Sequence, residues 1–345
     1  MSDASWNELV DIDRLTGWMD EKRLESGPLT GVKPLVGGTQ NIVIRFERGG
    51  CTFVLRRPPA NPYLDGNRIM RREARVLKAL AGTDVPHPRL IADCPDEEVL
   101  GAAFYLMEFV TGFDPRQLPE THMADPRLRE RMGYELADGI AALSRVDHVA
   151  AGLEDIGKVD GFLDRQVDRW RKQLDSYTKY SGWLGPTELR GIDRLATWLE
   201  RNRPQSFRPG ILHGDYHFPN VLYRNESAKL AAIIDWELTT VGDPLIDLGW
   251  MLATWPDADG NSPVMSIRPW SGFPTAAQLV RRYAETSGRD VSAADWYTVF
   301  GCYKLAVLLE GSHARSLAGK APLEIGERLH GRARVLVDRG LALIA

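Results

Sequence analysis

L-H-G-D-Y-H-F-P-N at residues 212–220 is followed by A-A-I-I-D-W-E at residues 231–237. The first stretch carries Asp215 and, five residues later, Asn220. The second begins as a short apolar run, typical of a buried strand, and reaches Asp235 at its end. Asp, Asn, Gly and Pro are also common in ordinary turns, so the first stretch alone is compatible with a plain loop. The strand that delivers a carboxylate favours a functional site instead.

An Asp, an Asn five residues later and a strand-terminal Asp follow the order found in kinase-type phosphotransferases. In that arrangement Asp215 orients the acceptor hydroxyl and accepts its proton late in the reaction. Asn220 and Asp235 supply oxygen atoms, which are the ligands that magnesium prefers. The pattern therefore predicts ATP and Mg²⁺ as cofactors, with Asp215 as the catalytic residue.

His213 and His217 stand four residues apart, as the two histidines of a zinc-binding helix do. Gly214 and Pro219 disfavour a regular helix there, and no Glu follows His213 in the H-E-x-x-H manner. Zinc is therefore not expected at these histidines, and His213 is predicted to brace the loop.

The N-terminal third contains a candidate phosphate-binding hairpin. Two strand-like runs, residues 42–48 and 51–56, are joined by a Gly-Gly turn. Backbone N–H groups in a Gly-rich entry to such a hairpin can face phosphate oxygens, although a plain turn is the alternative. The residues predicted to contact the phosphates here are Gly37, Gly38, Thr39 and Asn41.

Residues 68–80, R-I-M-R-R-E-A-R-V-L-K-A-L, have the periodicity of an amphipathic helix. Glu73 lies within the apolar stripe, so its carboxylate points toward the protein body and needs a cationic partner. Arg56, at the end of the second strand, is the predicted partner. Arg57 is the alternative if the register differs by one, although strand alternation would then turn it to the opposite face. Arg stands where kinases commonly carry Lys, and it adds a planar fork for phosphate oxygens.

With these motifs the chain resembles the aminoglycoside phosphotransferase and choline kinase superfamily over nearly its whole length. It is similar in particular to a subgroup related to the kinase domains fused to some acyl-CoA dehydrogenases, which also carries Arg at this strand position. The stretches that carry this similarity are V-L-R-R-P-P (54–59), F-L-D-R-Q-V-D-R-W (162–170), G-D-P-L-I-D-L-G-W (242–250) and Y-K-L-A-V-L-L-E-G (303–311). The resemblance implies a small-molecule kinase, and the fused relatives are thought to act on hydroxy acids or hydroxyacyl-CoA.

The expected fold class is α+β, a bilobal protein-kinase-like fold. Residues 1–107 form the predicted nucleotide-binding lobe with a small antiparallel sheet, and residues 108–345 form the helical lobe with the catalytic loop and acceptor pocket. The backbone of Glu108, Phe109 and Val110, at the connector, is predicted to bind adenine. Helices are expected at about residues 6–25, 68–80, 126–144, 161–174, 187–201, 245–254, 275–287, 293–316 and 325–343.

The segment after Asp235 indicates a small acceptor, because Asp247 follows only twelve residues later. This leaves no room for the long activation segment of a protein kinase. Asp247 is expected to brace the catalytic loop. Arg165 and Arg169 lie four apart on one helix and are predicted either to receive an anionic group of the acceptor or to form a solvated face.

Composition excludes several classes of function. A net charge of −4 provides no basic field for nucleic acid or an anionic membrane. No run of eighteen apolar residues and no basic, apolar leader is found, so neither a membrane span nor secretion is expected. Three widely spaced cysteines are typical of reduced thiols, and a cytoplasmic location is expected.

The leading hypothesis is an ATP- and Mg²⁺-dependent kinase that phosphorylates a hydroxyl of a small molecule, such as a hydroxy acid or hydroxyacyl-CoA. An aminoglycoside phosphotransferase is the first alternative. A nucleotide-binding pseudokinase is the second, and Arg56 is the feature in its favour. No stretch of the sequence singles out a surface for a partner chain.

Overall fold

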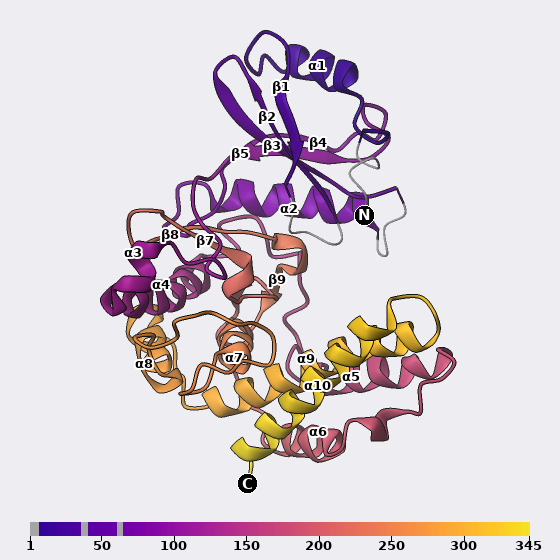
Figure 1. Cartoon of the computed structure of the whole chain (residues 1–345), viewed down its shortest axis with the longest axis vertical. Helices are drawn as coiled ribbons and strands as arrows, with labels where there is room; N and C mark the ends of the chain where they lie inside the picture. Colours follow the sequence, from indigo (N-terminus) through magenta and orange to yellow (C-terminus); the bar gives the residue numbers. More distant parts are fainter. Residues whose placement is uncertain (1–6, 36–40, 61–64) are drawn as a thin grey trace.

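The computed structural model describes residues 7–35, 41–60 and 65–345, and the chain forms two lobes (Figure 1). The upper lobe in Figure 1 contains a five-stranded sheet in the order β1-β2-β3-β5-β4, with antiparallel neighbours throughout. Its elements are α1 (Ile12–Glu21), β1 (Thr30–Pro34), β2 (Ile42–Arg48), β3 (Cys51–Arg57), α2 (Gly66–Leu80), β4 (Leu90–Cys94) and β5 (Phe104–Glu108).

The two faces of this sheet pack against different helices. One face contributes Ile44, Phe46 and Leu55 to a core shared with Leu15 and Trp18 of α1. The other face meets α2, whose buried side chains join the large core of the second lobe. Because side chains alternate along a strand, Arg56 and Arg57 must face opposite sides, and this alternation determines which of them reaches α2.

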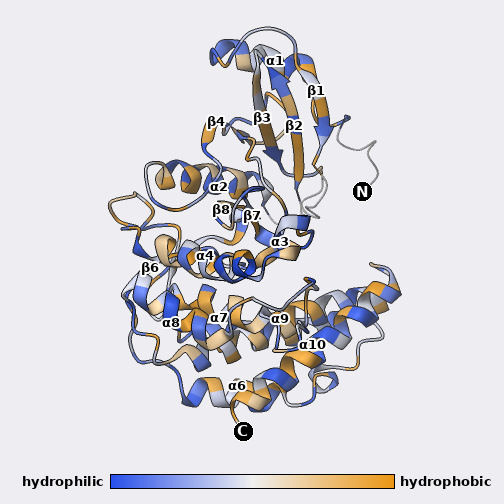
Figure 2. Ribbon diagram, turned by 60° about the vertical axis from the view of Figure 1, so that its left-hand side comes forward, coloured by the Kyte–Doolittle hydropathy of each residue, from blue (hydrophilic) through white to orange (hydrophobic). Residues whose placement is uncertain are grey.

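The lower lobe is mainly helical and is organised around α7 (Leu245–Thr254) and α9 (Ala294–Leu317). All ten residues of α7 are buried, as expected for a helix that is apolar on every side. Figure 2 shows pale to orange, hydrophobic colours on α7 and α9 and blue segments on α8 at the edge of the lobe. The other α-helices of this lobe are α3 (Glu120–Ala124), α4 (Pro126–Arg145), α5 (Gln166–Asp175), α6 (Ile192–Arg201), α8 (Ala276–Ser287) and α10 (Leu323–Leu343).

Two short antiparallel sheets lie between the upper lobe and the central helices. The first pairs β6 (Gly210–Leu212) with β9 (Thr240–Gly242), and the second pairs β7 (Val221–Tyr223) with β8 (Leu230–Ile233). The predicted catalytic and metal-binding residues lie on the turns that connect these four strands. The α+β, bilobal class is confirmed, whereas the predicted lobe boundary at residues 107 and 108 stays a prediction.

Several helix boundaries differ from the sequence-based expectations. The helix expected at about residues 6–25 spans Ile12–Glu21, because the Asp11 side chain accepts a hydrogen bond from the N–H of Arg14 and caps it. The helix expected at residues 161–174 begins only at Gln166. The helix expected at 187–201 begins at Ile192, after Gly191 with a φ of 91°. Periodicity located these helices, but local turns set their ends.

None of the helices in the described ranges combines the length and apolar character needed to cross a membrane.

Candidate active site

The predicted catalytic loop, residues 213–220, follows β6 and is held by Asp247 at the start of α7. The Asp247 carboxylate accepts hydrogen bonds from the backbone N–H groups of His213 (2.6 Å) and Gly214 (2.8 Å). Asp247 is 1% exposed, and burial raises the pKa of its carboxyl, which these two donors oppose. Asp247 therefore fixes the direction in which the chain enters Asp215, as expected of a bracing residue.

Two further contacts fix the same loop. The His213 Nε2 lies 2.9 Å from the carbonyl oxygen of Ile234, which joins the loop to the strand that carries Asp235. The Lys304 Nζ, from α9, donates to the carbonyl oxygen of Gly214 at 2.9 Å. Lys304 is buried beneath the ring of Trp250, and this burial lowers its pKa to about 8. A cation is thus held one residue from Asp215.

Asp215 and Asn220 lie side by side, as their spacing predicts. The Asn220 Nδ2 donates to the Asp215 carboxylate and to its carbonyl oxygen, both at 2.9 Å. The His217 Nε2 lies 3.3 Å from the other carboxylate oxygen of Asp215. Burial raises the pKa of the Asp215 carboxyl, but the hydrogen bond and charge of His217 and nearby cations outweigh it, so the pKa lies below its ordinary value. Asp215 is consequently ionised at neutral pH.

Arg56 contacts carboxylates of both lobes. Its Nε lies 2.9 Å from the carboxylate of Glu73 on α2, and its Nη2 lies 2.6 Å from that of Asp235. Tyr105, the neighbour of Arg56 on β5, donates its hydroxyl to Glu73 at 2.6 Å. Arg57 instead donates to the carbonyl oxygens of Pro58 and Leu100 on the other face of the sheet. The strand register therefore assigns the ion pair to Arg56.

Asp235 begins a left-handed turn, with a φ of 68°, that aims its carboxylate at Arg56. Glu237, two residues later, lies 3.5 Å from the same guanidinium and accepts a hydrogen bond from Asn41 Nδ2 at 2.9 Å. Burial, and then the charge of Asp235, raise the pKa of Glu237 to about 7. Asn41, predicted near the phosphates, thus reaches the turn at residues 235–237, where Asp235 is predicted to bind the metal. Gly37, Gly38 and Thr39 lie outside the described residues.

The connector that follows β5 holds the residues predicted to bind adenine. The backbone N–H of Glu108 donates to the carbonyl oxygen of Arg89 at 3.0 Å, and its side chain accepts from the N–H of Arg89. Phe109 is exposed, with the Arg45 guanidinium 5.0 Å from the centre of its ring. The Glu108 amide is occupied in this conformation, so the adenine contact predicted for this connector depends on its carbonyl and on Val110.

A cavity of about 890 Å³ opens beside the turn at residues 235–237, between α2, α5 and the segment 237–240. Glu237 and Leu238 form its edge toward Asp235, and Ile69 and Phe162 contribute apolar surface. The cationic side chains that line it are Arg68, Arg72, Lys158, Arg165, Arg169 and Lys172, against the carboxylates of Asp65, Asp168 and Glu237.

Not all of these cations are available to a ligand. Lys172 is paired with Asp168 at 2.7 Å, and Arg165 donates to the backbone carbonyls of Lys158 and Asp160. Arg169 packs its guanidinium 5.4 Å from the ring centre of Trp170. Arg165 and Arg169, the two arginines predicted from the sequence, both line the cavity. Arg165 is occupied by its backbone partners, whereas Arg169 presents its charge to the cavity.

Tyr105 and Lys304 are site residues that the sequence analysis did not assign. Tyr105 is the register partner of Arg56, so correct strand pairing would have placed its hydroxyl near Glu73. Lys304 was visible only as a cation within a long apolar run, and its direction depends on how α9 packs under the catalytic loop.

Residues 31–286 match the sequence model of the phosphotransferase enzyme family. The chain belongs to this family. The resemblance to the aminoglycoside phosphotransferase and choline kinase superfamily is thereby confirmed, and the comparisons place the chain among small-molecule kinases of this fold.

The curated relatives are longer proteins. The chain is 29% identical over 323 residues to acyl-CoA dehydrogenase family member 11 of Gallus gallus, covering 90% of this chain and 40% of the relative. It spans less than half the length of the curated relatives it matches.

Two solved structures illustrate the range of structural likeness. A protein of Ralstonia eutropha JMP134, provisionally described as an aminoglycoside phosphotransferase, is 31% identical, with a TM-score of 0.81 over 96% of this chain and 98% of that one. A thermostable mutant of aminoglycoside phosphotransferase APH(4)-Ia, in complex with ADP and hygromycin B, is 18% identical, with a TM-score of 0.59 over 94% and 98% of the two chains. At that identity the second likeness concerns the fold.

Proposed function

We propose that this protein transfers the γ-phosphoryl group of Mg-ATP to a hydroxyl of a small anionic molecule, a hydroxy acid or a hydroxyacyl-CoA thioester. The observation that carries the phosphoryl-transfer part is that Asn220 contacts Asp215 while Asp235 contacts the Arg56–Glu73 ion pair. The two segments meet where the backbone N–H of Ile234, next to Asp235, donates to the carbonyl oxygen of Asn220 at 2.9 Å. The complex of the structural neighbour with ADP supports a nucleotide as the donor.

The residues around Asp235 fit a magnesium ion by the chemistry of their donor groups. Asp235 offers a carboxylate and Asn220 a carboxamide oxygen, and both are hard oxygen ligands. The Asp235 carboxylate lies 2.6 Å from the Arg56 guanidinium, so it already balances a positive charge at this position. When bound, Mg²⁺ neutralises the charge on the β- and γ-phosphates.

The remaining steps belong to side chains of this chain. Asp215, ionised and held by Asn220 and His217, orients the acceptor hydroxyl and accepts its proton as the bond to phosphorus forms. Arg56 is held by Glu73 so that its planar fork can contact phosphate oxygens. Lys304 and Asp247 hold the segment before Asp215 in place through the carbonyl oxygen and the N–H of Gly214, respectively.

The cavity beside Glu237 supports an anionic acceptor. Six cationic side chains line it against three carboxylates, and its apolar residues offer room for an acyl chain. An aminoglycoside is a polycation and would require an excess of carboxylates instead. The similarity to acyl-CoA dehydrogenase family member 11 agrees with a CoA thioester or the acid derived from it.

The first test measures ADP release from Mg-ATP against hydroxyacyl-CoAs, free hydroxy acids, choline-like amines, sugars and aminoglycosides. We expect turnover with a hydroxy acid or hydroxyacyl-CoA, and we expect Asp215→Asn to abolish it. Asp259→Asn, which removes an exposed carboxylate in a distant loop, is the matched control. Undiminished turnover in Asp215→Asn would refute the catalytic assignment. Turnover only with aminoglycosides would refute the acceptor, and nucleotide binding without turnover would favour a pseudokinase.

A second test separates acceptor recognition from chemistry. Arg169→Gln removes the cation that faces the cavity, and we expect the KM for the acceptor to rise about tenfold or more, the usual effect of losing one charge-assisted hydrogen bond. The KM for ATP should stay unchanged. Arg334→Gln makes the same substitution at an exposed position of α10 outside the cavity. Equal acceptor KM values for both variants would contradict an anionic acceptor at Arg169.

A further inference from the structure

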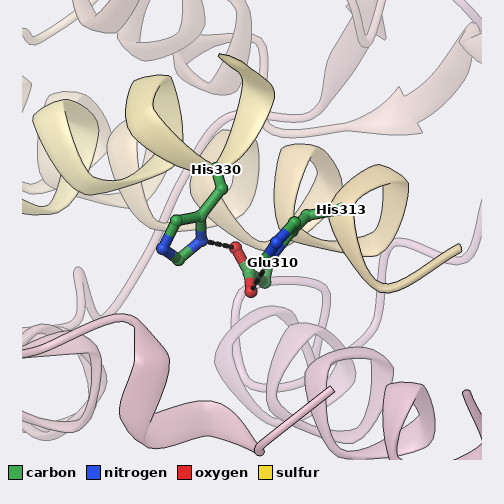
Figure 3. A group of neighbouring side chains, drawn as sticks. All are labelled: Glu310, His313 and His330. Atoms are coloured by element: carbon green, nitrogen blue, oxygen red, sulfur yellow. Dashed lines mark hydrogen bonds and ion pairs between the residues drawn. The ribbon is translucent and has the colours of Figure 1, made fainter. Parts of the chain in front are cut away.

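A cluster of two histidines and one glutamate lies between α9 and α10, apart from the kinase site. Glu310 and His313 belong to α9, and His330 belongs to α10 (Figure 3). The His313 Nδ1 lies 3.2 Å from one oxygen of the Glu310 carboxylate, and the His330 Nδ1 lies 2.7 Å from the other. The three ligand-type atoms all lie within 4.8 Å of one another.

The carboxylate of Glu310 is unusually deeply buried. The Glu310 side chain is 0% exposed, and the indole Nε1 of Trp183 also donates a hydrogen bond to its carboxylate, at 2.7 Å. Among the ion pairs of the described residues, Glu310 is paired with imidazoles and with no Lys or Arg. A buried carboxylate needs a compensating positive charge, and here two imidazoles stand where a Lys or Arg side chain would be expected.

The residue types and their spacing match a site for a transition metal. Glu310 and His313 form an E-x-x-H pair, a spacing by which one helix presents two ligands to one ion in helical bundles. His330 adds a third ligand from the facing helix. Zinc bonds to His nitrogen and carboxylate oxygen are about 2.0–2.2 Å, so ligand atoms around a tetrahedral ion stand roughly 3.3 Å apart. The separation of 3.2 Å between His313 Nδ1 and one Glu310 oxygen is close to that value. The separation of 2.7 Å between His330 Nδ1 and the other oxygen is a hydrogen-bond distance, and it would lengthen by about 0.6 Å around an ion.

We propose that Glu310, His313 and His330 form a binding site for one first-row divalent transition metal ion, of the Zn²⁺ type. The ion would take the place of the hydrogen atoms between each Nδ1 and the carboxylate, and each neutral imidazole would then carry its proton on Nε2. The His330 side chain is 18% exposed, which leaves a path for the ion and for a water molecule as its fourth ligand. Soft or borderline ions are favoured over Mg²⁺ because two of the three ligands are imidazoles.

Such an ion would fasten α10 to α9, the helix that also carries Lys304 under the catalytic loop. Trp183 would then act as a positioning residue, because its indole donates to the Glu310 carboxylate and so fixes the orientation of that ligand. The site is independent of the proposed kinase activity, and its test needs neither ATP nor an acceptor.

The test is calorimetric titration of the metal-free full chain with Zn²⁺ in the presence of excess Mg²⁺, with the bound ion located by anomalous scattering in crystals. We expect one Zn²⁺ per chain and an anomalous peak between the three side chains. His330→Gln should weaken binding at least tenfold. His148→Gln, which removes a half-exposed imidazole elsewhere, should leave binding unchanged.

Three results would overturn the proposal. They are no Zn²⁺ binding by the folded chain, binding of equal strength in His330→Gln and wild type, and an anomalous peak at Asp235 or another position alone. His330→Gln alters a side chain at the edge of the cluster, so it is the variant expected to fold. His313→Gln is the second variant, and circular dichroism of each confirms that the helices are intact before the titration.

Discussion

The Arg56–Glu73–Asp235 arrangement predicts that two substitutions in one ion pair have unequal costs. Glu73 is 0% exposed, and besides Arg56 it contacts the Tyr105 hydroxyl, which donates to its carboxylate at 2.6 Å. Arg56 by contrast also contacts Asp235 at 2.6 Å and Glu237 at 3.5 Å. Removing Arg56 leaves a buried carboxylate without a cation, whereas removing the charge of Glu73 leaves Arg56 with other partners.

The magnitudes follow from that asymmetry. Arg56→Met is expected to lower the free energy of unfolding by about 3–5 kcal/mol, the range for breaking a buried ion pair from one side. Glu73→Gln keeps a group that can accept from Tyr105, and its expected cost is about 1–2 kcal/mol. In the double variant the buried charge is gone, so its cost should lie well below the sum of the two single costs. Both single variants should lose about a hundredfold or more in kcat, because Arg56→Met removes the guanidinium and Glu73→Gln removes a charge that holds it in place.

The assay is urea unfolding of the nucleotide-free chain at pH 7, with kcat measured on the same preparations. Arg75→Met is the matched control, since Arg75 pairs with Asp155 on the surface with side chains 44% and 65% exposed. Its expected cost is about 0–1 kcal/mol. A cost of Arg56→Met no larger than that of Arg75→Met, or a cost of Glu73→Gln equal to that of Arg56→Met, would refute the reasoning.

Three further predictions concern the catalytic loop and the metal-binding turn. Burial lowers the pKa of Lys304 to about 8, so its charge is lost as pH rises through that value and kcat should fall above about pH 8. In Lys304→Arg this fall should move to higher pH, and a pH profile identical to that of the wild type would contradict this role. Burial and Asp235 raise the pKa of Glu237 to about 7, so Glu237 gains its negative charge as pH rises through 7, and the affinity for Mg²⁺, measured by titration, should rise with pH. In Glu237→Gln this pH dependence should flatten, and an unchanged slope would contradict the role of Glu237. Asp247→Asn leaves one of two buried backbone N–H groups without a carboxylate partner, so thermal unfolding should show a loss of about 1–3 kcal/mol together with a lower kcat, and unaltered stability would show that Asp247 is not the brace.

The phosphotransferase pattern was readable from the chain because its elements are local. Asp215 and Asn220 lie five residues apart on one loop, and Asp235 ends an apolar strand. The hairpin at 42–57 and the helix around Glu73 follow from period-two and helical patterns, which depend on nearest neighbours along the chain. These signals are sufficient for the fold class and for the residue types of the site.

Contacts between distant segments required the tertiary structure. The sequence left Arg56 and Arg57 as alternatives, and the register of β3 against β5 placed Arg56 beside Tyr105 and Glu73. Lys304 lies 90 residues from Gly214 in the chain, yet the packing of α9 puts its Nζ 2.9 Å from that carbonyl oxygen. His330 meets Glu310 only because α10 folds back along α9.

The physical reason is the range of the interactions involved. Periodicity and turn chemistry act over a few residues, so the sequence by itself determined the elements, the catalytic motif and the expected cofactors. Burial of charge acts through whichever helices and strands pack together, so only the tertiary structure decided which cation compensates Glu73, which lysine supports Asp215, and which side chains line the cavity beside Glu237.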